Sequence, residues 1–265
     1  MKLLIQIAYC GTAYCGYQVQ PNGVTVQQML NEAAQRLFGG PCDIVGCSRT
    51  DSGVHANAFC ATVANKGQEH LKTEIPVERI PLAFSAHLPQ DICVFDARWV
   101  SEHFHPRYDV AEKEYVYRIY NRPVRSPFEE GRACHVPKPL SEADIERMQR
   151  AAAQFLGTQD FTSYMAQGSK ITDAVRTVTL SQIEREGDVV IYRVRANGFL
   201  YNMVRILTGT LLAVGEGKLE PEDIPAVTAA KDRSRAGITM PPHGLYLNRV
   251  IYPARAMQAD WEGHS

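Results

Sequence analysis

Residues 46–56 read Gly-Cys-Ser-Arg-Thr-Asp-Ser-Gly-Val-His-Ala and join two apolar segments, 42–47 and 58–64, that have the character of β-strands. Asp-Ser-Gly is typical of a turn, because aspartate can hydrogen-bond its own backbone and Gly53 can adopt a positive φ. The pattern predicts a turn that holds Asp51 and Arg49 at the end of a β-sheet. An aspartate in a turn is commonly a backbone-capping residue, so that interpretation stands beside a catalytic one.

The composition limits the classes of protein to consider. The chain has 265 residues, of which 45% are hydrophobic and 22% are charged, as in an ordinary globular protein. No apolar run of about eighteen residues occurs, and the apolar start is too short for a signal peptide, so we expect a cytoplasmic protein with no membrane contact. The formal net charge of −1 gives no sign of a nucleic-acid partner. RNA binding would therefore depend on local basic patches.

The cysteines do not predict a metal centre. All seven are scattered, and none has the C-x-x-C spacing of a zinc knuckle. A site made by the spaced pairs Cys10/Cys15 or Cys42/Cys47, the latter near His55, is the weaker alternative. We expect reduced thiols and no metal. The chain also lacks a glycine-rich phosphate loop, so we expect no cofactor.

Periodicity and turn residues predict the secondary structure. Strands are expected at 3–9, 42–47, 58–64, 91–100, 107–121, 175–184, 188–197 and 244–252, and helices at 26–38, 76–84, 141–156, 200–214 and 221–231. Thr25 with Gln28 fits a capping box, and Ser141 fits an N-cap. Short groups of strands mixed with helices indicate an α+β fold: a mixed, mainly antiparallel sheet running through two similar α/β halves, with helices on one face. The proline-rich stretch after Tyr120 predicts halves 1–122 and 123–265.

Two further residues, Arg205 and Tyr115, can each have a functional or a purely structural role. Arg205 lies in the largely apolar segment Phe199–Leu207, where it either reaches the solvent edge of a helix or pairs with a buried acid and keeps that acid charged. Tyr115 lies in a strand, where a tyrosine usually packs in a core. An aromatic ring with a hydroxyl also suits stacking on a base and proton transfer.

Three segments resemble motifs of the TruA family of tRNA pseudouridine synthases. They are Arg49–Ala56, which is the family's catalytic loop, Lys113–Tyr117 and Phe199–Arg205. Weaker matches follow in the family's order along nearly the whole chain: Gly16–Gln20, Phe104–Tyr108, Asp160–Ser163, Ala230–Arg233 and Gly244–Leu247. The chain departs from the family pattern at Ser48, where glycine is common, and at Ile206, where asparagine is common.

The resemblance implies a role for each candidate residue. Asp51 corresponds to the essential catalytic residue, Arg205 to the arginine that contacts it, and Tyr115 to the tyrosine that stacks on the target base. Arg49 would fill the space left by the flipped base, a role that a planar cation suits. His55 lies in the motif, and we interpret it as a residue that braces the loop and not as a base. The resemblance further implies a homodimer that acts on uridines of the tRNA anticodon stem-loop, positions 38, 39 and 40.

The chemistry of one carboxylate beside a cation supports this hypothesis. Such a carboxylate stays ionised, which suits a nucleophile and does not suit a general acid. A small-molecule glycoside hydrolase would need a second carboxylate, and none stands out beside the loop. The alternative is a non-catalytic RNA-binding protein on the same scaffold. Attack by Asp51 at C1′ of the ribose and attack at C6 of uracil both remain open.

Basic residues outside these motifs are candidates for holding the RNA backbone, although any one of them can be a solvated surface side chain. These candidates are Arg107, Lys113, Arg118, Arg122, Lys170, Arg176, Lys231 and Arg233.

Overall fold

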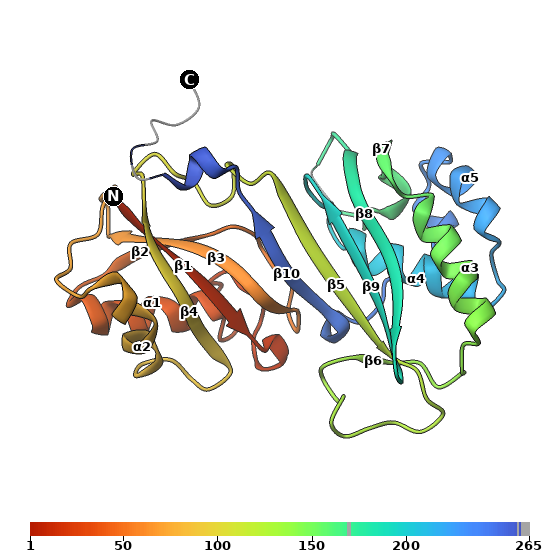
Figure 1. Ribbon diagram of the computed structural model, residues 1–265, viewed down its shortest axis with the longest axis horizontal. Helices are drawn as coiled ribbons and strands as arrows, with labels where there is room; N and C mark the ends of the chain where they lie inside the picture. The colour runs from red at the N-terminus through yellow and green to blue at the C-terminus, as the bar shows by residue number, and fades with distance from the viewer. Residues whose placement is uncertain (169–170, 259, 261–265) are drawn as a thin grey trace. The chain divides into compact units, whose positions relative to one another are not determined.

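Ten β-strands and five α-helices form in the described part of the chain, residues 1–168, 171–258 and 260 of a computed structural model (Figure 1). The strands are β1 (Lys2–Tyr9), β2 (Cys42–Gly46), β3 (His55–Asn65), β4 (Ile92–Val100), β5 (Glu112–Tyr120), β6 (Cys134–His135), β7 (Gly157–Asp160), β8 (Val175–Glu186), β9 (Val189–Ala196) and β10 (Leu245–Ile251). The helices are α1 (Val26–Phe38), α2 (Ile80–Ser85), α3 (Glu142–Ala153), α4 (Met203–Gly215) and α5 (Ile224–Ala229). Among the strand pairs whose register is defined, β5 and β6 are parallel and the others are antiparallel. The prediction of a mixed, mainly antiparallel sheet in an α+β fold is therefore confirmed.

The chain divides into two compact units. The first contains residues 1–111 and 247–265, and the second contains residues 112–246. This division differs from the predicted halves 1–122 and 123–265. The strand that carries Tyr115 belongs to the second unit, and the C-terminal segment returns to the first because β10 lies beside β3.

The first unit is a sheet with the strand order β4-β1-β3-β10, to which β2 adds by pairing with β3. Leu3 lies opposite Val63 and Ile5 opposite Ala61, and all four side chains are fully buried. Helices α1 and α2 contact each other and the strands β2 and β4, so they pack on the sheet together. The alternation of apolar residues along β1 therefore decides which face of the sheet becomes the core.

Helix α1 begins at the predicted residue but without the full capping box. The Thr25 hydroxyl accepts a hydrogen bond from the Gln28 backbone N–H, as expected for an N-cap. The side-chain amide of Gln28 instead donates to Glu32, one turn further along the helix. At α3, Ser141 and Asp144 form the reciprocal capping box, so the predicted N-cap at Ser141 is confirmed.

The second unit is a sheet in the order β5-β9-β8-β7, with β6 pairing in parallel with β5. Tyr115 and Tyr117 lie opposite Val194 and Tyr192, and all four are buried. The other face of β5 and β9 carries a separate apolar cluster that includes Val116. Successive residues of β5 therefore face opposite sides of the sheet, as in a regular strand.

Several predicted elements have different bounds in the structure. Helix α2 begins at Ile80 and not at residue 76, and Pro81 lies in its first turn, where its missing N–H costs nothing. Strand β5 begins at Glu112 and not at residue 107, because His105 and Asp109 close a turn there. Helix α4 begins at Met203, after Asn202 in the left-handed conformation.

Helix α4 is the most enclosed element of the second unit, with most of its residues buried. The loop 236–240 crosses it at Gly209. A Cβ at that glycine would lie 2.0 Å from the carbonyl oxygen of Ile238. The loop can approach the helix this closely only because residue 209 has no side chain.

We expect Gly209→Ala to lower the free energy of unfolding by about 1–2 kcal/mol, because overpacking against backbone outweighs the better helix preference of alanine. Chemical denaturation monitored by circular dichroism measures the change. Gly40→Ala is the matched control, since a Cβ there meets nothing within 4 Å. Equal stability of the two variants would contradict the close crossing.

Candidate functional site

The Asp51 loop joins β2 to β3 in the first unit, as the sequence predicts. The backbone N–H of Val54 donates to the Asp51 carbonyl oxygen at 3.2 Å, which closes a turn, and Gly53 has a φ of 78°. Asp51 is half-buried and Arg49 is exposed. The turn therefore presents two opposite charges, of which the carboxylate is the more enclosed.

A second loop, residues 11–17 at the end of β1, packs directly against the Asp51 loop. The Tyr14 carbonyl oxygen accepts from the Ser52 hydroxyl at 3.2 Å, and the Tyr17 N–H donates to the Thr50 carbonyl oxygen at 3.1 Å. The Thr50 hydroxyl also shares a buried hydrogen bond of 2.8 Å with the Tyr9 hydroxyl. These contacts hold the backbone on both sides of Asp51.

Two glycines make this contact possible. A Cβ at Gly11 would lie 1.9 Å from the Val54 carbonyl oxygen, and one at Gly16 would lie 2.6 Å from the Thr50 carbonyl oxygen. Gly16 also has a φ of 82°, which a side chain rarely tolerates. The sequence motifs include Gly16 only in a weak match and do not include Gly11.

His55 braces the loop, in agreement with its predicted role. Its side chain is buried, and Nδ1 accepts a hydrogen bond of 3.1 Å from the Gly11 N–H. Tyr14 adds a second brace by donating to the Asp91 carboxylate at 2.5 Å. Burial and this carboxylate both raise the pKa of Tyr14, so the hydroxyl keeps its proton and the hydrogen bond.

Arg205 lies in the second unit, on the first turn of α4. Its Nε donates to the Met240 carbonyl oxygen at 2.6 Å, and one terminal nitrogen donates to the Asn202 side-chain oxygen at 2.7 Å. Two hydrogen bonds from different nitrogens fix the plane of the guanidinium. Asn202 precedes the helix in a left-handed conformation, and its side chain accepts from Arg205 and does not cap the helix backbone.

Tyr115 is also in the second unit and is buried on β5, with 8% of its surface exposed. Its ring meets Phe199 edge-to-face, with centroids 5.0 Å apart and an interplanar angle of 84°. This geometry is favourable for aromatic pairs and restricts rotation of the tyrosine ring. The pairing of Asp51 with Arg205 stays a prediction, as do the assigned roles of Arg49 and Tyr115.

Most of the other basic candidates are engaged in contacts within the protein. Arg118 pairs with Glu129, Arg122 with Asp188, and Lys231 with Asp160. Arg176 and Arg233 donate to backbone carbonyl oxygens. Lys170 lies outside the described residues. Arg107 differs from these, because it lines a cavity beside Arg49.

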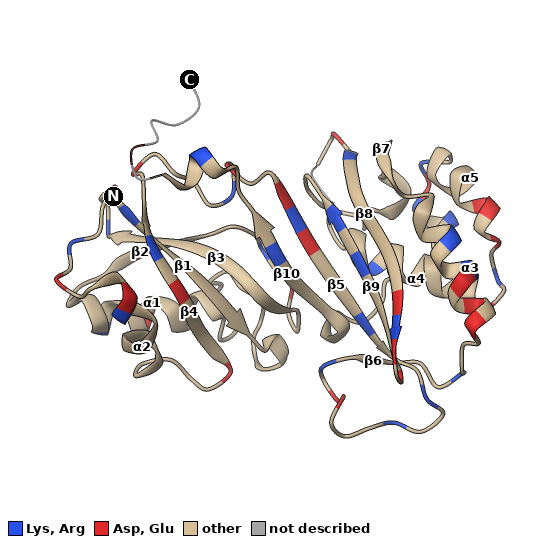
Figure 2. Cartoon of the chain, viewed as in Figure 1, with Lys and Arg blue, Asp and Glu red and all other residues tan. Residues whose placement is uncertain are grey.

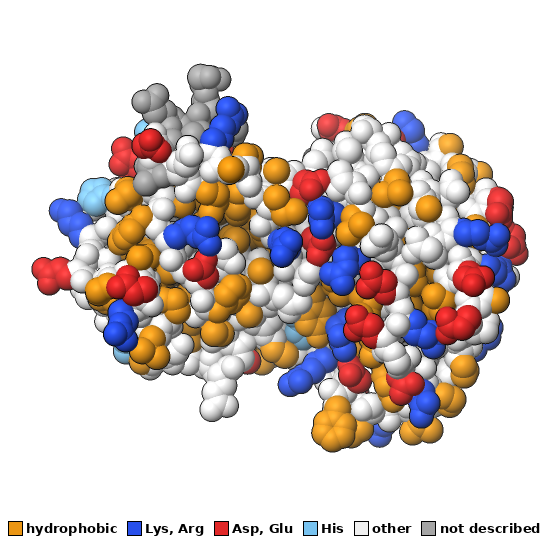
Figure 3. Space-filling view, in the orientation of Figure 1, with side chains coloured by type: hydrophobic (Ala, Val, Ile, Leu, Met, Phe, Trp, Pro, Cys, Tyr) orange, Lys and Arg blue, Asp and Glu red, His pale blue; other side chains and the backbone are white. Residues whose placement is uncertain are grey.

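A buried carboxylate that sequence reasoning did not single out is Glu114, beside Tyr115. It pairs with Arg195 at 2.6 Å and with Arg193 at 3.3 Å, and its side chain is 6% exposed. Figure 2 shows acidic and basic residues alternating along β5 beside the basic residues of β9. Two arginines neutralise this carboxylate, which indicates a structural role on the sheet. On the face seen in Figure 3, basic and acidic side chains are likewise interspersed.

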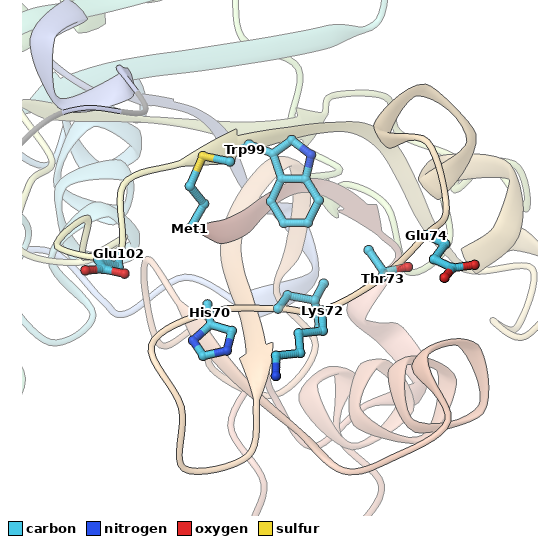
Figure 4. A pocket seen from close by; sticks show the side chains of 8 residues that line it. Met1, His70, Lys72, Thr73, Glu74, Trp99 and Glu102 are labelled. Atoms are coloured by element: carbon cyan, nitrogen blue, oxygen red, sulfur yellow. The ribbon is translucent and has the colours of Figure 1, made fainter.

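The first unit includes two cavities of different size among its described residues. The larger, about 640 Å³, is lined by Trp99 and by residues 70–74, with Met1 and Glu102 (Figure 4). Its wall carries both signs of charge, with Lys72 beside Glu74 and Glu102. The smaller, about 200 Å³, is lined by Arg49, Arg107 and Tyr17 and lies beside the Asp51 loop.

Within the described residues, the cysteines are free thiols, and no three His, Cys, Asp or Glu side chains come together as a metal site. The same residues include no helix long and apolar enough to cross a membrane.

A family model described as tRNA pseudouridine synthase matches residues 5–109 and 151–253. The chain belongs to the tRNA pseudouridine synthase family. One relative is the protein named tRNA pseudouridine synthase A from Thermoanaerobacter sp. (strain X514), which is 43% identical over 251 residues, covering 95% of this chain and 99% of the relative. Another protein of the same name, from Halalkalibacterium halodurans, is 43% identical over 252 residues, covering 94% of this chain and 91% of the relative. A third, from Bacillus pumilus, is 43% identical over 257 residues, covering 95% of this chain and 99% of the relative.

The matched segments of this tRNA pseudouridine synthase family member carry most of the candidate site. The first contains the loops around Gly16 and Asp51, and the second contains Arg205. Tyr115 lies between the two matched segments. The family's recognition from sequence motifs is thus confirmed over both halves of the chain.

His105, on the wall of the smaller cavity, provides a test of the local structure. Burial lowers the pKa of His105, and Asp109 partly offsets the shift. Its Nδ1 accepts from the backbone N–H groups of Arg107 and Tyr108, so a proton there would break both hydrogen bonds.

The folded pKa of His105 is below the ordinary value, so the unfolded chain takes up the proton first as the pH falls. We expect the stability contributed by His105 to be present above about pH 6.5 and to be lost as the pH falls below it. Urea unfolding at several pH values, compared with His105→Gln, measures this. Below about pH 6.5, the free energy of unfolding should fall less in the variant than in the wild type. Identical pH profiles of the two proteins would contradict a lowered pKa for His105.

Proposed function

We propose that this protein isomerises uridine to pseudouridine in tRNA, with Asp51 as the nucleophile. The support is the Asp51 loop itself: a half-buried carboxylate in a turn that the 11–17 loop holds on both sides, in a chain of the tRNA pseudouridine synthase family. We further propose, from the sequence resemblance, that the uridines lie in the anticodon stem-loop, that the enzyme is a homodimer and that it is cytoplasmic.

The target uridine must leave the base stack before Asp51 can reach it, at a cost of a few kcal/mol. In this proposal the Arg49 guanidinium occupies the vacated space, because it is exposed, planar and cationic and can bond a phosphate or a base edge. Tyr115 faces the extruded uracil. Its ring supplies a stacking surface, and its contact with Phe199 fixes its orientation.

The reaction then exchanges a carbon–nitrogen bond for a carbon–carbon bond. In one route, a carboxylate oxygen of Asp51 bonds to C1′, the N1–C1′ bond breaks, and the uracil leaves with the electron pair. After the base rotates, C5 bonds to C1′ as the bond from Asp51 to C1′ breaks. The C5 proton then passes to a base and N1 takes up a proton, so the product has the same atoms as uridine. In the other route, Asp51 adds first to C6 of uracil and the N1–C1′ bond breaks. C5 then bonds to C1′, the bond from Asp51 to C6 breaks, the C5 proton passes to a base, and N1 takes up a proton. Neither route consumes water or changes an oxidation state overall.

Arg205 is proposed to keep the Asp51 carboxylate ionised. Its guanidinium is fixed by the Met240 carbonyl oxygen and by Asn202, so its orientation is set before substrate binds. A fixed cation stabilises a carboxylate without reorganisation during the reaction. A small-molecule glycoside hydrolase is disfavoured because it needs a second carboxylate near the bond, and the one beside Tyr115, Glu114, is already paired with two arginines.

Asp51→Asn should reduce tritium release from tRNA labelled at C5 of uridine by at least about 1,000-fold, because the amide is a poor nucleophile. The affinity for tRNA should stay within a few-fold of wild type. Single-turnover tritium release and filter binding measure the two quantities. A non-catalytic RNA-binding protein would give no tritium release even with the wild-type chain.

Arg205→Ala should slow tritium release by about 100-fold or more, because Asp51 loses its fixed counter-charge. Arg205→Lys should retain part of the rate, since it keeps a charge but not the planar pair of hydrogen bonds. Thermal unfolding identifies any variant that fails to fold. Wild-type turnover by a folded Arg205→Ala variant would show that the pairing is wrong.

A further inference from the structure

The smaller cavity of the first unit has a wall that the proposed chemistry does not use. The turn Phe104–Asp109 contributes His105, Arg107 and Tyr108 to this wall, which faces the cavity together with Arg49 and Tyr17. Arg107 contributes a charge to it, and Tyr108 and His105 contribute aromatic rings. Every residue of the lining belongs to the first unit.

The turn is held rigidly from within. The His105 N–H donates to the Asp109 carboxylate at 2.6 Å, and the Asp109 N–H donates back to the His105 carbonyl oxygen at 3.1 Å. The His105 ring accepts from the N–H groups of Arg107 and Tyr108. Asp109 is buried with 5% exposure, so the turn is anchored in the unit.

Tyr108 is a large aromatic side chain that lies exposed on this rigid turn. It is 73% exposed, and its ring stacks on His105 with centroids 4.2 Å apart and an interplanar angle of 29°. The histidine covers one face of the ring and leaves the other open. Because the ring is already held in place, little side-chain entropy would be lost when a base stacks on it.

The charges of the cavity suit a phosphate. Arg49 and Arg107 both line it, and its lining includes no carboxylate. Among the described residues, neither arginine forms an ion pair with an acidic side chain. The hydroxyl of buried Tyr17 also has no hydrogen-bond partner in the described part of the chain, and a ligand oxygen or a water would supply one.

We propose that this cavity binds the nucleotide adjacent to the target uridine, with its phosphate on Arg107 and its base stacked on Tyr108. The inference rests on the proposed function. Arg49 connects the two sites, because it lines the cavity and also enters the space that the flipped base leaves. Tyr108 and Arg107 are then positioning residues that fix the RNA strand beside Asp51.

The first test is the stacking contact. Tyr108→Ala should weaken tRNA binding and raise KM for tritium release about 5- to 100-fold, with kcat nearly unchanged. Tyr108→Phe should behave as wild type because it keeps the ring. Phe128→Ala, which removes a side chain with 85% exposure elsewhere, is the control and should have no effect.

A second test identifies the RNA partner of Tyr108. Two tRNA transcripts carry an abasic nucleotide on the 5′ or the 3′ side of the target. On one of them, the difference between wild type and Tyr108→Ala should disappear, because the stacking base is already missing. A loss that persists on both transcripts, or no loss on intact tRNA, would overturn the proposal.

The phosphate contact has its own signature. Arg107→Gln should reduce the slope of log binding constant against log salt by about 1, and Arg36→Gln, on the exposed face of α1, should not. An unchanged slope for Arg107→Gln would overturn this part. Failure of the proposed function would look different, because the wild-type protein would then release no tritium from tRNA.

Discussion

The close backbone contact between the 11–17 loop and the Asp51 loop is the constraint on which the candidate site depends. Two glycines permit it, at distances where a Cβ would overlap carbonyl oxygens of the partner loop. Hydrogen bonds from the 11–17 loop to the Thr50 backbone and to the side chains of Ser52 and His55 hold the loop around Asp51 in place. A carboxylate held this way loses little freedom when it reacts, which is the advantage of a preorganised site.

The second unit uses the same principle around Arg205. The loop 236–240 crosses α4 where Gly209 has no side chain, and its Met240 carbonyl oxygen thereby reaches the guanidinium. Asn202 accepts the second hydrogen bond from a backbone conformation that asparagine tolerates better than most residues. In the first unit a close approach at two glycines holds the backbone around Asp51, and in the second unit a close approach at Gly209 brings a carbonyl oxygen to Arg205.

The distribution of charge accounts for a neutral chain in a family that acts on tRNA. Many arginines and lysines are paired with carboxylates, as Glu114 shows with Arg193 and Arg195. In the described part of the chain, Arg49 and Arg107 form no ion pair with a carboxylate, and both line one cavity. A local cationic cavity can bind one phosphate with defined geometry, whereas a uniformly basic surface would attract RNA without register.

The amino-acid sequence by itself determined the Asp51 turn, most helices and strands, the mixed α+β class and the family. Turn chemistry, capping and apolar periodicity act over a few residues, and the family motifs are short strings, so all of them can be read along the chain. Only the tertiary structure decided that residues 105–109 form a turn and not a strand, and that the β5 strand belongs with residues 112–246. It also decided the partners of Arg205 and the cavity at Tyr108. These features join segments far apart in sequence, and burial and backbone hydrogen bonding choose such partners only when the whole chain has folded.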